Sequence, residues 1–171
     1  MLRIFKKRRK MKKCFLIMIY LLLVNSLVGQ EDSGKVVQID NPNYDHQLAD
    51  SLGADDYGMK SYFLVILITG KSTISDKEKV NESFRSHMDN INKLVEQNKL
   101  IVAGPLEKND NGYRGIFIFT DVESKEEVDV LLKNDGAIQN GLLDYETIKW
   151  YGSAALPTYL PNSDKIWKVE P

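Results

Sequence analysis

The feature that most constrains the fold is a run of seven consecutive apolar residues, Tyr62–Ile68. A short apolar run of this kind predicts a β-strand whose two faces are both apolar. Such a strand needs a layer of protein on each face, and helices of the same chain can cover one of them. No remaining segment of the chain is apolar enough to cover the other face. The pattern therefore predicts a partner subunit there.

A long amphipathic helix is predicted for residues 75–97. Its apolar positions recur at steps of three and four, at Val80, Phe84, Met88, Ile91, Leu94 and Val95. Ser75 and Glu78 form a capping box, in which the hydroxyl and the carboxylate each accept a hydrogen bond from a backbone amide. His87 lies one helical turn from Phe84 and shares the core-facing side with the apolar residues. This placement makes His87 the most function-like residue of the sequence.

The remaining elements complete a recognisable order. They are a short helix at 45–52 ended by Gly53, a hairpin of strands at 99–106 and 113–120, a shorter helix opened by the capping box 124–127, a loop or broken turn at 134–141 and a last strand at 143–151. Without the first short helix, the order is β-α-β-β-α-β. This is the ferredoxin-like α+β plan, a four-stranded antiparallel sheet with both helices on one face. Two such sheets packed face to face would make a dimeric α+β barrel.

Residues 1–30 have the composition of a secretory signal peptide. They carry eight basic residues and no acidic one, and the basic run precedes an apolar stretch at Cys14–Val24. This stretch is shorter than the roughly 20 apolar residues that a membrane-spanning helix needs. We expect cleavage near Gly29 or Gln30 and a secreted or periplasmic protein. The alternatives left open are an uncleaved segment that anchors the chain to a membrane, and a true start at Met11.

We expect four parts: the signal peptide at 1–30, a linker with the short helix at 31–58, a ferredoxin-like domain at 59–152 and a C-terminal tail at 153–171. The part after the signal peptide is acidic, with 15 basic against 24 acidic residues. This balance argues against nucleic acid as a partner, because binding phosphates requires clustered Lys and Arg.

The sequence predicts neither a metal site nor a cofactor. Cys14, within the signal peptide, is the only cysteine, so the rest of the chain has no disulfide and no thiolate metal ligand. The two histidines, His46 and His87, are far apart and share no metal-binding spacing. We expect His46 to be a solvated surface residue.

Several motifs resemble those of the YciI-like (YCII-related) family of proteins. They cover about residues 59–156, in the expected order and spacing: Ser86–Ile91, Lys99–Pro105, Arg114–Phe119, Asn134–Ile138 with the later Gly141, and Trp150–Leu156, whose ending is similar to a secreted bacterial branch of the family. The resemblance implies the dimeric ferredoxin-like barrel. It also implies an active-site His–Asp pair, which falls on His87 and Asp135. Characterised relatives in the wider superfamily isomerise lactones or act on chlorinated and hydroxylated aromatics.

One position departs from the family pattern. Gly136 stands where the family has a proline after the aspartate, so we expect the loop that holds Asp135 to be looser. Arg85 and Arg114 are candidates for binding an anionic group of a substrate. A solvated position for Arg85 and a surface salt bridge for Arg114 are the alternatives.

Three functional hypotheses remain open from the sequence. The first is a cofactor-free enzyme whose pocket lies between the helices and the sheet near the dimer interface, and in which His87 moves a proton on a small organic acid, lactone or hydroxylated ring. The second is a non-catalytic small-molecule-binding or structural dimer, in which Asp135 satisfies His87 as a core hydrogen bond. The third is an interaction module that uses the acidic surface and the tail.

Overall fold

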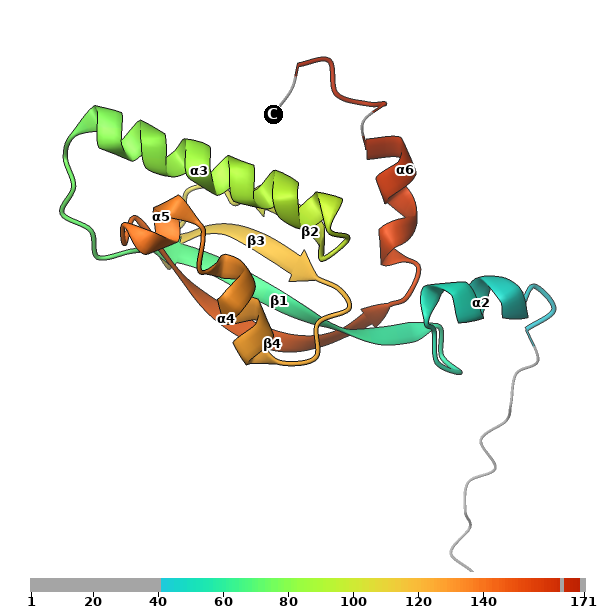
Figure 1. The fold of residues 1–171 in the computed structure, drawn as a ribbon. Helices are drawn as coiled ribbons and strands as arrows, with labels where there is room; N and C mark the ends of the chain where they lie inside the picture. The colour runs from blue at the N-terminus through green and yellow to red at the C-terminus, as the bar shows by residue number, and fades with distance from the viewer. Residues whose placement is uncertain (1–40, 164, 170–171) are drawn as a thin grey trace, which may run out of the picture. The chain divides into compact units, whose positions relative to one another are not determined.

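The computed structural model describes residues 41–163 and 165–169. The predicted signal peptide and residues 31–40 of the predicted linker lie outside these residues. The turn at 41–44 is closed by a hydrogen bond from the Tyr44 amide to the Asn41 carbonyl oxygen, and the chain from Asp45 onward forms a separate compact unit. Its elements are α2 (His46–Leu52), β1 (Met59–Thr69), α3 (Lys77–Glu96), β2 (Leu100–Pro105), β3 (Tyr113–Phe119), α4 (Lys125–Leu132), α5 (Gly136–Gln139), β4 (Leu143–Ser153), the 3-10 helix η1 (Leu156–Tyr159) and α6 (Leu160–Ser163) (Figure 1).

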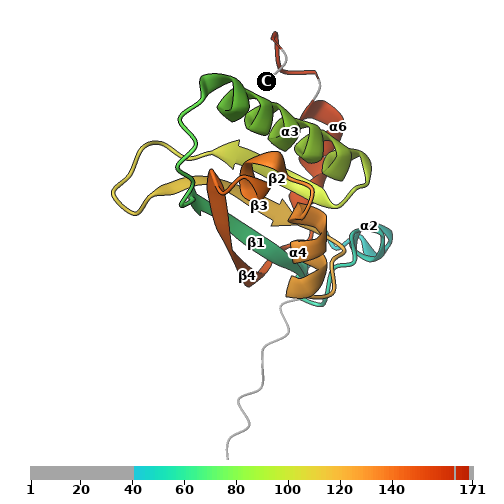
Figure 2. The ribbon, with the colours of Figure 1, turned by 60° about the vertical axis from the view of Figure 1, so that its left-hand side comes forward.

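The four strands form one antiparallel sheet in the order β2-β3-β1-β4. This is the strand order of the ferredoxin-like fold, so the predicted α+β fold class is confirmed. The apolar run predicted to be a strand forms most of β1, which pairs with β3 on one side and β4 on the other. Helices α3 and α4 cover the same face of the sheet in both ribbon views (Figures 1 and 2).

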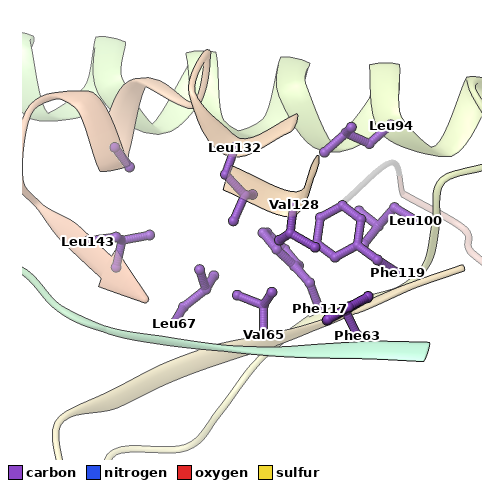
Figure 3. Packing of buried hydrophobic residues seen from close by; sticks show 11 residues of the cluster. Phe63, Val65, Leu67, Leu94, Leu100, Phe117, Phe119, Val128, Leu132 and Leu143 are labelled. Carbon is purple, nitrogen blue, oxygen red and sulfur yellow. The ribbon is translucent and has the colours of Figure 1, made fainter. Parts of the chain in front are cut away.

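The main hydrophobic core lies between this face and the helices (Figure 3). Alternate residues of β1 point to it, because successive side chains of a strand face opposite sides. The cluster consists of Phe63, Val65, Leu67, Leu100, Phe117, Phe119 and Leu143 from the sheet and Leu94, Val128, Leu132 and Ala137 from the helices. Burial of these side chains supplies most of the free energy that holds the helices on the sheet.

The opposite face of the sheet is covered in part by the chain itself. Leu156 and Leu160, from η1 and α6, pack on a cluster formed by Tyr62, Ile101 and Ile118. The Tyr159 hydroxyl, in the same segment, donates a hydrogen bond to the Ile101 carbonyl oxygen. The expectation that no segment of this chain could cover this face is therefore wrong for this end of the sheet, because the predicted tail contributes apolar residues in helical turns.

The rest of the opposite face remains open. Leu64 and Ile66 of β1 and Ile116 of β3 are only half-buried, and Ile148 of β4 is exposed. These four residues, which we call the open apolar patch, occupy paired positions of three neighbouring strands. The sheet thus shows one covered end and one uncovered end on this face.

Helix α3 differs from its prediction at its start and in its buried side. Asp76, rather than Ser75, is the N-cap and accepts hydrogen bonds from the amides of Glu78 and Lys79. Its buried residues are Ser83, His87, Asn90 and Leu94, whereas the predicted core residues Phe84, Met88 and Val95 are exposed. The buried side is rotated from the apolar stripe because α3 faces the connection after α4 with polar side chains.

The other predicted helix ends are confirmed. Asp45 caps α2, and Gly53 follows it with a φ of 67°, a left-handed conformation that favours glycine. Ser124 caps α4 by accepting a hydrogen bond from the Glu127 amide. The Glu127 carboxylate accepts from the Glu123 amide instead of the Ser124 amide, so this capping box is shifted by one residue.

The loop before β1 is organised by one carboxylate. Asp55 accepts hydrogen bonds from the amides of Tyr57 and Met59 and from the Tyr151 hydroxyl. The Tyr151 hydrogen bond, followed by the Met59 amide, lowers the pKa of Asp55 below its usual value. The same hydrogen bond to Asp55 is the main cause that raises the pKa of Tyr151 to about 12. Tyr151 is thus a structural contact of β4 with this loop.

Candidate functional site

The structure brings His87 and Asp135 together. Nδ1 of His87 lies 2.6 Å from Oδ2 of Asp135, which is a short hydrogen-bonding distance. His87 is near the middle of α3, and Asp135 is the N-cap of α5. The Asp135 side chain is fully buried, with 0% exposed, and the His87 side chain is 11% exposed. The two residues that the family resemblance paired are therefore neighbours inside the protein.

Both carboxylate oxygens of Asp135 take part in hydrogen bonds. While Oδ2 faces His87, Oδ1 accepts hydrogen bonds from the amides of Ala137 at 3.0 Å and Ile138 at 3.2 Å. These are the orphan amides at the start of α5, and an aspartate is among the best residues to cap them. The carboxylate consequently has a fixed orientation toward the imidazole.

Gly136 allows this arrangement by bringing α5 close to α3. A Cβ atom at position 136 would lie 2.6 Å from Cβ of Ser86 and 3.1 Å from the carbonyl oxygen of Ser83. Real Cβ atoms do not approach other heavy atoms as closely as the first distance. The expectation that Gly136 makes the Asp135 loop looser is therefore wrong: the glycine is a packing contact between two helices.

Two further polar residues of α3 make contacts nearby, Ser83 with the residue after α5 and Asn90 with α4. The Asn140 amide donates to Oγ of Ser83 at 2.8 Å, and the Asn90 amide lies 3.5 Å from the Leu131 carbonyl oxygen. Ser83, His87 and Asn90 are spaced by four and three residues, so they form one line along α3, here called the polar seam. Sequence reasoning missed Ser83 and Asn90, although their helical spacing around His87 was a signal that could have found them.

The imidazole ring lies between two aromatic side chains. It stacks on Phe117, with ring centroids 5.8 Å apart, and meets Phe84 edge to face at 6.1 Å. Within residues 41–163 and 165–169, Nε2 of His87 has no hydrogen-bond partner, and it is not among the fully enclosed polar atoms that lack one. This nitrogen is therefore in contact with solvent.

The contact with Asp135 also sets the tautomer. An ionised carboxylate only accepts hydrogen bonds, so Nδ1 carries the hydrogen atom that joins the pair. In the neutral ring Nε2 is then unprotonated and can accept a proton from a reacting group. After that transfer, the adjacent carboxylate stabilises the imidazolium. Chemically, the pair has the parts of a general base, a site for one proton transfer.

A shallow groove lies on the outward side of α3, away from the buried side that carries His87. It has a volume of about 480 Å³ and is lined by Asn81, Phe84, Arg85, Met88 and Asp89. Phe84 joins this groove to the pair, because its ring also meets the His87 ring. The groove is not where we expected a pocket, between the helices and the sheet.

The other predicted residues lie apart from His87. Arg85 is an exposed residue of the groove. Arg114 is exposed near the start of β3, at the register irregularity opposite Leu67 and Ile68 of β1. His46 is exposed and lies 3.0 Å from Asp50 on α2, as expected of a surface residue. Arg85 is two residues from His87 along α3, so it lies on the opposite side of the helix. The structure therefore brings neither arginine to the pair.

Among residues 41–163 and 165–169, no three His, Cys, Asp or Glu side chains gather in a way that could hold a metal ion. In the same part of the chain, no helix has the length and apolar character needed to cross a bilayer.

Comparisons with known proteins add little. No family model matches the chain, and no curated protein matches it. One solved structure similar to it is 5-chloro-2-hydroxyhydroquinone dehydrochlorinase (TftG) from Burkholderia phenoliruptrix AC1100, in complex with 2,5-dihydroxybenzoquinone. The two chains are 21% identical, with 52% of this chain and 92% of that chain covered and a TM-score of 0.38. Similarity at this level carries no argument about function.

The packing at Gly136 gives a prediction. We expect Gly136→Ala to lower the free energy of unfolding by about 1–3 kcal/mol, because the added methyl overpacks the contact with α3. Ser86→Gly removes the clashing side chain, at a helix-propensity cost of about 1 kcal/mol when made alone. The double variant should lose less unfolding free energy than the two single variants lose in total, as urea unfolding would measure. Simple additivity would contradict the proposed contact.

Proposed function

We propose that this protein is an exported, YciI-like protein in which His87 acts as a general base on a small organic molecule, without a cofactor. The observation that carries the proposal is the 2.6 Å contact between Nδ1 of His87 and the fully buried Asp135. It leaves Nε2 without a partner in the described part of the chain. The motifs that resemble the family and the ferredoxin-like strand order support the same assignment.

The proposed chemistry is one proton transfer and its return. Nε2 of His87 removes a proton from a C–H or O–H group of the substrate, and the substrate keeps the electron pair. Asp135 keeps its hydrogen bond to Nδ1 and stabilises the positive charge that the ring acquires. The imidazolium then returns the proton to another atom of the substrate, so an isomerisation of a lactone, acid or hydroxylated ring needs no further reactant.

The groove is proposed to hold the body of such a molecule, whose reacting group would pass the Phe84 ring to reach His87 from the outward side of α3. Phe84 and Met88 offer an apolar surface, and both are partly exposed, at 41% and 37%. The exposed guanidinium of Arg85 lies at the same groove and can bind a carboxylate. A small organic acid with an apolar body fits this combination best among the three proposed substrate classes.

A thermal-shift screen with small carboxylic acids, lactones and hydroxylated aromatics tests the proposal. A substrate should raise the melting temperature of the wild type. In Arg85→Gln, the preference for an acid over its neutral amide should disappear. Compounds that bind should then be assayed for conversion by the wild type and by Asp135→Asn, whose amide can still cap α5. We expect conversion by the wild type only, and equal conversion by both proteins would exclude the pair as the base.

The alternative is a binding or structural protein in which His87 is part of the core. The polar seam favours it, because three side chains of α3 contact α4 and the two ends of α5 and His87 is nearly buried. Stability alone does not separate the two functions, since removing His87 leaves the buried carboxylate without a partner in either case. Binding without any conversion, in every compound class, would favour this alternative.

We also propose that a second copy of the chain covers the open apolar patch. Two charged residues lie near the patch: the basic Arg114 on β3 and the acidic Glu146 on β4, which flanks β1 on the other side. If the two sheets pack face to face about a two-fold axis parallel to the strands, β3 of each copy lies over the β4 side of the other copy. Arg114 of one copy is then directed toward Glu146 of the other. The patch is therefore complementary to itself in both apolar character and charge.

This homodimer leads to a specific expectation. Ile66→Lys should place a charge in the centre of the interface and convert the protein to a monomer, as sedimentation velocity would measure. Val130→Lys, on an exposed part of α4, is the matched control and should leave the dimer intact. A wild type that is monomeric at all accessible concentrations would contradict the proposal.

A further inference from the structure

The chain after α6 carries apolar side chains that the fold does not bury. Ile166 and Val169 are 81% and 79% exposed, and Trp167 between them is about half exposed. They alternate with Lys165 and Lys168 in an otherwise acidic protein. Three large apolar residues in such a short stretch indicate a contact surface, because exposed apolar groups in clusters are uncommon on soluble proteins.

The position of this segment is fixed at its start. Leu156 and Leu160 pack on the sheet, and the Tyr159 hydroxyl bonds to the carbonyl oxygen of Ile101 in the edge strand β2. In both ribbon views, residues 165–169 lie over α3, on its side away from the sheet (Figures 1 and 2). The chain after α6 is thereby directed to the outer side of α3.

That side of α3 has an unpartnered apolar stripe of its own. Phe84, Met88 and Val95 are the exposed large apolar residues of the helix, and we call them the outer stripe. The stripe is about 16 Å long at 1.5 Å per residue. Six residues from Ser163 to Val169 can extend about 20 Å, so the segment is long enough to follow it. Asp89, beside Met88 in the groove, offers a carboxylate to the lysines.

We propose that residues 165–169 form a strap that closes on the outer stripe of α3 in the same molecule. Trp167 and Ile166 or Val169 then bury apolar surface against Met88 and its neighbours, while Lys165 and Lys168 approach Asp89. A closed strap covers the groove, so a ligand has to displace it. The contact itself does not depend on a substrate or on a catalytic role for His87.

Tryptophan fluorescence tests the strap in the full chain. The protein has two tryptophans, so the difference between the wild type and Trp167→Phe isolates the emission of Trp167. We expect a blue-shifted emission that acrylamide quenches weakly, at every protein concentration. Met88→Lys should shift the emission to the red and increase quenching several-fold, whereas Val130→Lys on α4 should change neither. Circular dichroism checks that each variant is folded.

Two results would overturn the proposal. One is a wild-type Trp167 emission as red and as easily quenched as that of a free peptide. The other is protection that appears only at high concentration, which would place the segment on a second molecule. A disulfide gives an independent check in a Cys14→Ser background: Met88→Cys with Val169→Cys should cross-link within one molecule, and Val130→Cys with Val169→Cys should not. Failure of the first pair to form that cross-link also counts against the strap.

Discussion

Asp135→Ala is expected to lower the free energy of unfolding by about 2–4 kcal/mol. The substitution removes the N-cap of α5, which is worth about 1 kcal/mol. It also leaves the nearly buried Nδ1 of His87 without its partner, at a cost of about 1–3 kcal/mol. Urea unfolding of the wild type and the variant would measure the difference. A loss below 0.5 kcal/mol, roughly that of an ordinary surface substitution, would contradict the buried contact.

Asp135→Asn is the matched control for this experiment. Its carbonyl oxygen can still accept from the amides of Ala137 and Ile138, so the α5 cap should survive. Its amide group donates toward His87, however, which moves the imidazole hydrogen to Nε2. We expect a smaller loss of stability than for Asp135→Ala, together with loss of any proton transfer at Nε2.

Phe117→Ala should be the most destabilising of the substitutions considered, by about 3–5 kcal/mol. Phe117 is almost fully buried in the main core, touches Phe119 edge to face and stacks on the His87 ring. Removing the ring leaves a cavity between the sheet and α3 and takes away the surface on which the imidazole rests. Thermal or urea unfolding would show the loss.

A comparison with Phe117→Leu separates packing from support of His87. Leucine fills most of the space, so its effect on stability should be much smaller than that of alanine. Both substitutions remove the aromatic stack, and both should therefore shift the NMR signals of the His87 ring. Unchanged ring signals in both variants would mean that Phe117 does not position the imidazole.

The fold could be predicted from sequence because its signals are local and consistent. The apolar run predicted strand β1, and the turn residues between two apolar segments predicted the β2–β3 hairpin. Asp45 and Ser124 stand at helix starts and act there as caps. Together with the order of the elements, these signals leave few topologies other than the ferredoxin-like one.

The predictions that proved wrong concern contacts between segments that are distant in the sequence. The side of α3 that is buried is set by the packing of Ser83 and Ser86 against α5. No pattern within the helix sequence indicates this packing. The cover supplied by Leu156 and Leu160 depends on where the chain after β4 folds back. Gly136 was expected to loosen its loop. In the structure its missing side chain instead allows α5 to lie close to α3.

The candidate site was predicted only through the family resemblance. Sequence patterning placed His87 on the buried side of a helix, but nothing local connects it with Asp135, which is 48 residues away. The charge patterning also gave no means of separating Arg85 from Arg114. In the structure, Arg85 lies on the outward side of α3 and Arg114 lies near the start of β3.

The most direct test of the account is the tautomer of His87, read by histidine-selective ¹⁵N NMR. The two histidines of the chain are distinguished by comparison with His46→Gln. The account predicts that neutral His87 carries its hydrogen on Nδ1 and leaves Nε2 unprotonated, and that Asp135→Asn reverses the two nitrogens. A wild-type spectrum with the hydrogen on Nε2 would contradict it, because His87 could then not act as a base oriented by Asp135.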